Sequence, residues 1–139
     1  MSTRGTAYFE IQYEHDKEPV RVGKICIRFD AYPEGFGKDI CNIILSAYIA
    51  DAGAENSTDK PIGTFFPNVE RVILHILDVT PSDFYVEKEF VYRFIFQPYN
   101  NNSPICQVGK ILHVEVKPQY EDDFSGSFAE FLDYCAPKW

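Results

Sequence analysis

Residues 30–39, Asp-Ala-Tyr-Pro-Glu-Gly-Phe-Gly-Lys-Asp, join a segment with strand periodicity to a segment with helical periodicity. Pro33 fixes its own φ angle and is tolerated in the first turn of a helix. Gly35 and Gly37 permit a tight turn or a close approach of the backbone. Connections of this kind often carry the binding residues of a small fold. The junction therefore marks both the start of the first helix and a candidate site.

Two alternating segments precede the junction, over residues 8–14 and 20–30. Apolar residues occupy one side of each segment, which predicts two half-buried strands. The polar turn between them, ending in Pro19, makes the pair an N-terminal hairpin. Glu10 is assigned to the solvent side. The side chains predicted to be buried are Phe9, Ile11 and Tyr13 in the first strand and Ile25, Ile27 and Phe29 in the second.

Two helices are predicted after the junction. Apolar residues at three- and four-residue spacing indicate a first helix over residues 34–50, and the small, polar residues 51–63 indicate a loop. Asn68 is expected to cap a second helix, which Thr80 and Pro81 end. The predicted inner stripes are Phe36, Ile40, Ile43, Ile44 and Ala47 in the first helix and Val69, Val72, Ile73 and Ile76 in the second.

The C-terminal half is predicted to add two strands and a third helix. Strands are expected over residues 84–97 and 105–116, with a further strand if residues 84–87 pair separately. A final helix is expected to begin at Ser125 or Ser127. Hairpins combined with helices predict an α+β fold of a single domain over residues 1–139, with an antiparallel sheet of four to five strands and about three helices packed mainly on one face. The apolar residues that define these elements are Phe90, Tyr92, Phe94 and Phe96, then Val108, Leu112, Val114 and Val116, then Phe128, Phe131, Leu132 and Cys135.

Composition narrows the function classes. The net charge of −8 argues against direct contact with nucleic acid and against binding to an anionic membrane. The chain has 9 Tyr and 12 Phe, and a surplus of aromatic residues favours a contact surface for a partner. Cysteines without paired spacing, and the lack of an apolar run or a targeting peptide, predict a reduced, cytoplasmic protein.

Two groups of residues are candidates for binding. Asp30 and Tyr32 could hold a sugar or a base, while backbone N–H groups near Gly35 and Gly37 could face a small phosphorylated ligand. The alternative is that these four residues only build the turn, and the negative charge of Asp39 would repel a phosphate. The second group could form a stacking or partner surface beside the core face of the aromatic strand: Tyr85, Tyr92, Arg93 and Tyr99.

Catalytic and metal-binding patterns are weak. His15, His75 and His113 show no metal-ligand spacing, so no metal or cofactor is predicted. We expect Met1 to be removed, which leaves the α-amine of Ser2 beside its hydroxyl, the minimum for an N-terminal nucleophile hydrolase. No supporting partners for that chemistry are evident, so an enzyme is not favoured.

Three segments resemble a family of small phage and bacterial proteins. They are Met1-Ser2-Thr3-Arg4-Gly5, the junction Asp30-x-Tyr32-Pro33-x-Gly35-x-Gly37 and, more loosely, Glu89-Phe90-Val91-Tyr92. The chain departs from the pattern at Ala31, where the family has glycine, so this position does not require a left-handed backbone. The resemblance covers under a fifth of the chain and implies an origin in phages and their bacterial hosts more than a mechanism.

Three hypotheses follow. The leading one is a non-enzymatic binding protein of phage type that occupies a host protein, including a component of antiviral defence, with Arg4 added to the candidate binding residues. The second is a protein that captures a small phosphorylated ligand, such as a nucleotide signal, at the Asp30–Gly37 junction. The third is a small hydrolase with Ser2 as its nucleophile. A homodimer through an uncovered sheet edge is also open.

Overall fold

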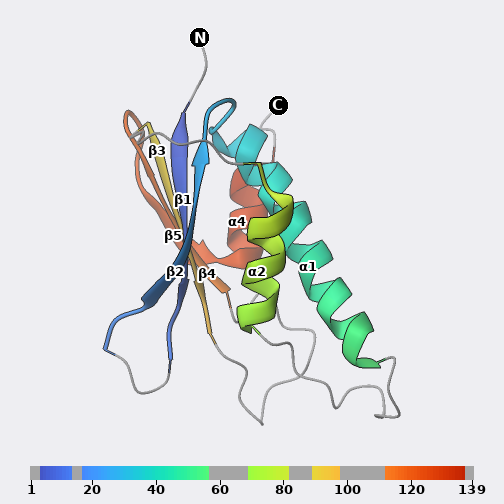
Figure 1. Ribbon diagram of the computed structural model, residues 1–139. Helices are drawn as coiled ribbons and strands as arrows, with labels where there is room; N and C mark the ends of the chain where they lie inside the picture. The colour runs from blue at the N-terminus through green and yellow to red at the C-terminus, as the bar shows by residue number, and fades with distance from the viewer. Residues whose placement is uncertain (1–3, 14–16, 57–68, 82–88, 98–111, 137–139) are drawn as a thin grey trace.

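The computed structural model describes residues 4–13, 17–56, 69–81, 89–97 and 112–136. Within these residues, five strands form one sheet in the order β2-β1-β3-β4-β5, and helices cover one of its faces (Figure 1). This confirms the predicted α+β fold. The strands are β1 (Gly5–Ile11), β2 (Val20–Ile27), β3 (Phe90–Phe96), β4 (Leu112–Pro118) and β5 (Phe124–Ser127). The helical elements are a π-helical turn, η1 (Pro33–Gly37), and three α-helices, α1 (Lys38–Asn56), α2 (Val69–Val79) and α4 (Phe128–Cys135).

The sheet is mixed, which differs from the predicted antiparallel arrangement at one pair of strands. β1 pairs with β2 as the expected hairpin, but it pairs in parallel with β3 on its other side, with Ala7 opposite Tyr92. Parallel neighbours need a long crossover, and η1, α1 and α2 supply it on one face of the sheet. The β3–β4 and β4–β5 pairs are antiparallel.

The first helix is longer than predicted. The π-helical turn η1 begins at Pro33, and α1 follows it directly and extends to Asn56. Residues 51–56, which were predicted to be a loop, are therefore helical. Two alanines favour the helix there, and one interior glycine, Gly53, is tolerated at a cost of about 1 kcal/mol. Residues 57–63 of the predicted loop lie outside the described part of the chain, as does Asn68, the predicted cap of α2.

The fifth strand lies where the sequence predicted only a helix cap. Phe124–Ser127 pairs with β4, and Ser127 then caps α4. A four-residue strand is too short to show a reliable alternation, so this prediction missed it. The strand considered over residues 84–87, and the predicted part of β4 over residues 105–111, lie outside the described residues.

The core lies between the sheet and the helices. The predicted aromatic face of β3 is confirmed, since Tyr92, Phe94 and Phe96 are fully buried, with Phe94 stacked on Phe9 of β1 at 5.3 Å between ring centroids. The predicted stripe of α2 is also buried. Phe29 is a correction: it was predicted to be buried, but it is 62% exposed because β2 ends at Ile27 and the alternation does not continue beyond it.

Candidate functional site

The junction after β2 is a compact turn built around Asp30. Asp30 has a φ of 55°, the one positive value at a non-glycine residue in the described part of the chain, and aspartate tolerates this left-handed region better than most residues. The amide of Phe36 donates to the Asp30 carbonyl at 2.8 Å, and the amide of Gly35 donates to the Tyr32 carbonyl at 3.0 Å. These two amides are therefore engaged inside the turn and do not face an anion.

The two glycines of the junction are explained by close contacts. A Cβ atom at Gly35 would lie 2.6 Å from the Asp30 carbonyl oxygen. At Gly37 it would lie 2.5 Å from the Cys135 Sγ atom on α4. Both distances are too short for real Cβ contacts, so these positions let the turn close and let α4 approach η1. This favours a structural role for both glycines.

The described residues of the three segments that carry the family resemblance meet at one corner of the fold. Gly5 pairs with Phe90 across the parallel strands, and a Cβ atom at Gly5 would lie 3.0 Å from the Cβ of Ala31. The Tyr92 hydroxyl donates to the Ala31 carbonyl, and burial raises the pKa of Tyr92 far above its ordinary value, so the donor keeps its proton. The corner therefore fixes the N-terminus of β1 against the junction.

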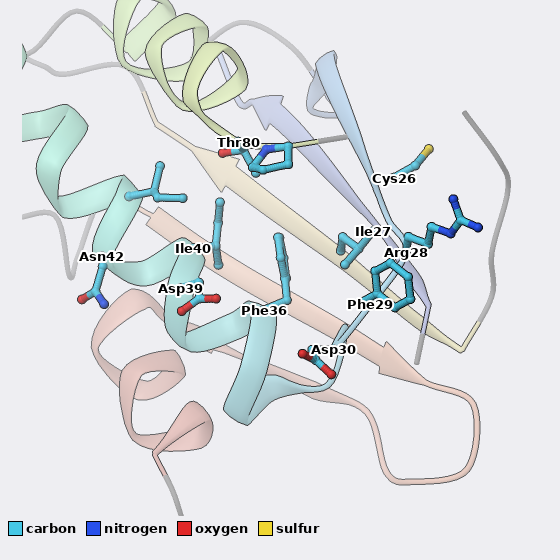
Figure 2. A pocket seen from close by; sticks show the side chains of 12 residues that line it. Cys26, Ile27, Arg28, Phe29, Asp30, Phe36, Asp39, Ile40, Asn42 and Thr80 are labelled. Atoms are coloured by element: carbon cyan, nitrogen blue, oxygen red, sulfur yellow. The ribbon is translucent and has the colours of Figure 1, made fainter. Parts of the chain in front are cut away.

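A pocket of about 620 Å³ opens beside this corner, between the end of β2, the start of α1 and the end of α2 (Figure 2). Its apolar lining comes from the end of β2 and the residue Phe29 after it, from η1 and α1, and from Pro81 beyond α2. Its polar groups come from the residues after β2, from α1 and from the residue after α2. The apolar lining residues are Cys26, Ile27, Phe29, Phe36, Ile40, Ile43 and Pro81, and the polar ones are Arg28, Asp30, Asp39, Asn42 and Thr80.

The charge of the pocket favours some ligands over others. The carboxylates of Asp30 and Asp39 both line it, and both residues are exposed. Arg28 supplies a positive charge on the other side, with its guanidinium carbon 5.5 Å from the centroid of the Phe29 ring. An apolar group with a neutral or cationic neighbour fits this lining better than a phosphate does, because two carboxylates repel an anion.

The structure separates the other residues predicted to bind. Tyr32 is exposed in the junction and does not line the pocket, and Arg4 is exposed immediately before β1. Arg93 lies on β3 with its side chain on the face opposite the helices, as its register beside Tyr8 shows. Tyr85 and Tyr99 lie outside the described residues.

Arg93 is the centre of a ladder of charged hydrogen bonds across the helix-free face of the sheet. It donates to Glu10 on β1 at 2.6 Å and to Glu115 on β4 at 2.8 Å. Arg21 on β2 donates to the other oxygen of Glu10, through Nε at 3.1 Å and a terminal nitrogen at 3.0 Å. His113 Nε2 lies 3.7 Å from Glu115. We call these five residues the charge ladder.

Glu10 is the residue of the charge ladder whose exposure to solvent was predicted wrongly. It does point away from the helices, as alternation predicts, but its side chain is only 3% exposed because two guanidinium groups cover it. The hydrogen bond to Glu10 in turn raises the pKa of Arg93. The sequence gives no signal for this burial, because the two arginines that cover Glu10 lie on other strands, Arg21 on β2 and Arg93 on β3.

Among the described residues, no group of three or more histidine, cysteine or acidic side chains is arranged to hold a metal ion. Cys26, Cys41 and Cys135 are free thiols and are buried. A hydrogen bond with Cys41, together with burial, raises the pKa of Cys135 far above its ordinary value, which leaves it a poor nucleophile. Within the same residues, no helix has the length and apolar character needed to cross a membrane.

Comparison of the chain with family models, with curated proteins and with solved structures found no match.

Proposed function

We propose that this protein is a non-enzymatic binding protein that occupies a partner protein through the pocket between β2, α1 and α2. The observation that carries the proposal is Phe29, which is 62% exposed at the lining of an apolar pocket. Covering an exposed phenylalanine is worth roughly 1.5–3 kcal/mol, so a partner gains affinity by burying it. Aromatic residues beside a pocket are also typical anchors of protein interfaces.

A host protein is the partner class that follows from the resemblance to phage proteins, and a component of antiviral defence is the first kind to examine. The proposal places the protein in the cytoplasm of a bacterial cell, where thiols such as Cys26, Cys41 and Cys135 stay reduced.

A second candidate function is the capture of a small ligand in the same pocket. Its volume of about 620 Å³ is within the usual range for small-molecule sites, about 300–1,000 Å³. Asp30 and Asp39 favour a neutral or cationic ligand, and the engaged amides of the junction offer no cradle for the phosphate of a nucleotide. The nucleotide hypothesis remains a prediction with less support than a non-phosphorylated ligand.

Substitution of Phe29 tests the proposed function. Phe29→Ser should abolish capture of the partner from a bacterial cell extract by the immobilised protein, measured by quantitative mass spectrometry. Leu74→Ser is the matched control, because Leu74 is equally exposed, at 65% against 62%, but lies on α2 outside the pocket lining. Capture that depends equally on both residues, or on neither, would contradict the proposal.

Native mass spectrometry separates the two candidate functions. A small molecule that is bound to the purified wild-type protein and absent from the Phe36→Ala variant would favour ligand capture. A partner polypeptide retained by the wild type and lost by Phe29→Ser would favour the binding-protein proposal.

A further inference from the structure

Strand β2 is an edge of the sheet. Within the described residues its only strand neighbour is β1, and two apolar side chains on it, Val20 and Val22, are exposed. An exposed edge strand can pair with an extended segment of another chain, whose backbone then gains hydrogen bonds while alternate side chains set the specificity.

The charges along this edge select the kind of segment. Residues 20–28 contain three basic residues and no acidic one, on a chain whose net charge is −8. Arg21 and Lys24 lie on the helix-free face, since they pair with Glu10 and Tyr8 of β1. A second copy of β2 would bring the same basic residues to this edge, and like charges are destabilising wherever they lie opposite one another. The edge therefore disfavours self-pairing and favours an acidic partner.

The charge ladder points the same way. From β4 to β2 its charges alternate, with Glu115, Arg93, Glu10 and then Arg21. Arg21 ends the ladder at the sheet edge, and its side chain is 53% exposed. A carboxylate on an added strand, opposite Arg21, would continue the alternation in the same geometry.

We propose that β2 accepts an extended segment of the partner in which acidic residues alternate with apolar ones. This inference rests on the proposed function and specifies the chemistry of the partner. The acidic side chains face Arg21 and Lys24 on the helix-free side. The apolar side chains face the helix side, where Ile27 at the end of β2 lines the pocket with Phe36 and Ile40 of the helical layer.

A synthetic peptide tests the charge requirement. The probe is an eight-residue peptide in which glutamate alternates with valine and phenylalanine, and its binding is measured by isothermal titration calorimetry. Lys24→Glu should weaken binding about threefold to tenfold, because an attraction becomes a repulsion near the surface. Lys117→Glu is the matched control, since Lys117 is an exposed lysine on the same face but on β4, and it should leave affinity unchanged. A peptide with lysine in place of glutamate should not bind.

Backbone pairing is tested with two isomers of the same peptide, methylated on alternate backbone nitrogens. Alternate amides of a strand point to opposite edges, so one isomer should bind and the other should not. Amide hydrogen exchange of the wild type should slow at residues 20–24 when the unmethylated peptide binds. Equal binding of both isomers, no binding of the acidic peptide, or a dimer of the protein that Lys24→Glu strengthens would overturn strand addition.

The two proposals fail separately. If Phe29→Ser abolishes partner capture but the acidic peptide does not bind, the proposed function stands and strand addition is wrong. If the peptide binds at residues 20–24 but Phe29→Ser leaves partner capture intact, the proposed pocket contact is wrong.

Discussion

Glu10 demonstrates that strand alternation predicts the direction of a side chain better than its burial. The pattern in β1 correctly assigns Glu10 to the face without helices, yet two arginines from neighbouring strands remove it from solvent. A buried carboxylate is tolerated only when its charge is paired and its oxygens are hydrogen-bonded, and both oxygens of Glu10 accept from a guanidinium. Glu10 therefore contributes to the pairing of three strands at once.

Removal of this carboxylate should be costly. Glu10→Ala leaves two arginines facing each other across β1 and should lower the free energy of unfolding by about 3 kcal/mol. The measurement is urea unfolding followed by circular dichroism. Glu115→Ala is the matched control, because Glu115 is more exposed at 28% and shares Arg93, and it should cost about 1 kcal/mol or less. Equal losses of unfolding free energy in the two variants would show that the burial of Glu10 adds nothing to the stability that its ion pairs contribute.

At the scale of elements, α4 is defined by its N-terminus. The helix has eight residues, and such a short helix is marginal without capping or packing. Ser127 accepts from the amide of Glu130 at 3.2 Å, and the Glu130 carboxylate accepts from the amide of Ser127 at 3.0 Å. The capping residue Ser127 is also the last residue of β5, so the last helix follows the last strand directly.

Loss of the cap should destabilise the fold and alter its response to acid. Ser127→Ala should lower the free energy of unfolding by about 1 kcal/mol near neutral pH. The hydrogen bonds from the Ser127 backbone and side chain lower the pKa of Glu130, so the stability they contribute is present above the ordinary glutamate pKa and is lost as pH falls through the lowered value.

Thermal unfolding measured between pH 7 and pH 3 checks both effects. The difference between the wild type and Ser127→Ala should shrink as the pH falls, because the variant lacks the hydroxyl that helps to lower the pKa of Glu130, and protonation of Glu130 removes that contribution from the wild type. Ser125→Ala is the control, since Ser125 faces His113 and takes no part in the capping box. A difference that stays constant with pH would show that the Ser127 hydroxyl does not contribute to the lowered pKa of Glu130.

At the scale of the whole molecule, two buried thiols interact between the first helix and the last, Cys41 on α1 and Cys135 on α4. Cys41 and Cys135 are each 2% exposed, and the Sγ atom of Cys135 occupies the space that a Cβ atom at Gly37 would need. We expect neither thiol to react with iodoacetamide in the native state at neutral pH. Their alkylation, mapped by mass spectrometry, should follow the global unfolding transition in urea. Rapid alkylation of Cys135 without urea would show that α4 opens separately.

The sequence predicted the buried face of an element correctly where the periodic pattern of apolar residues was long. The stripe of α2 and the aromatic face of β3 were predictable because each repeats over at least two turns or several alternations. The parallel β1–β3 pair was not, since strand order depends on the path of the crossover. Of the candidate site, Asp30 lines a pocket and its role in binding stays a prediction, whereas Phe29 was wrongly assigned to the core because the end of β2 has no sequence signal.

The parallel pairing of β1 with β3 has a consequence for synthesis of the chain. Glu10 and Arg93 are 83 residues apart, so at about 5–20 residues per second β1 leaves the ribosome roughly 4–17 s before its central partner exists. Arg21, only 11 residues from Glu10, is made within a few seconds of it. During translation Arg21 can therefore pair with the carboxylate of Glu10 before Arg93 has been synthesised. The charge of Glu10 is then already neutralised in the nascent N-terminal hairpin.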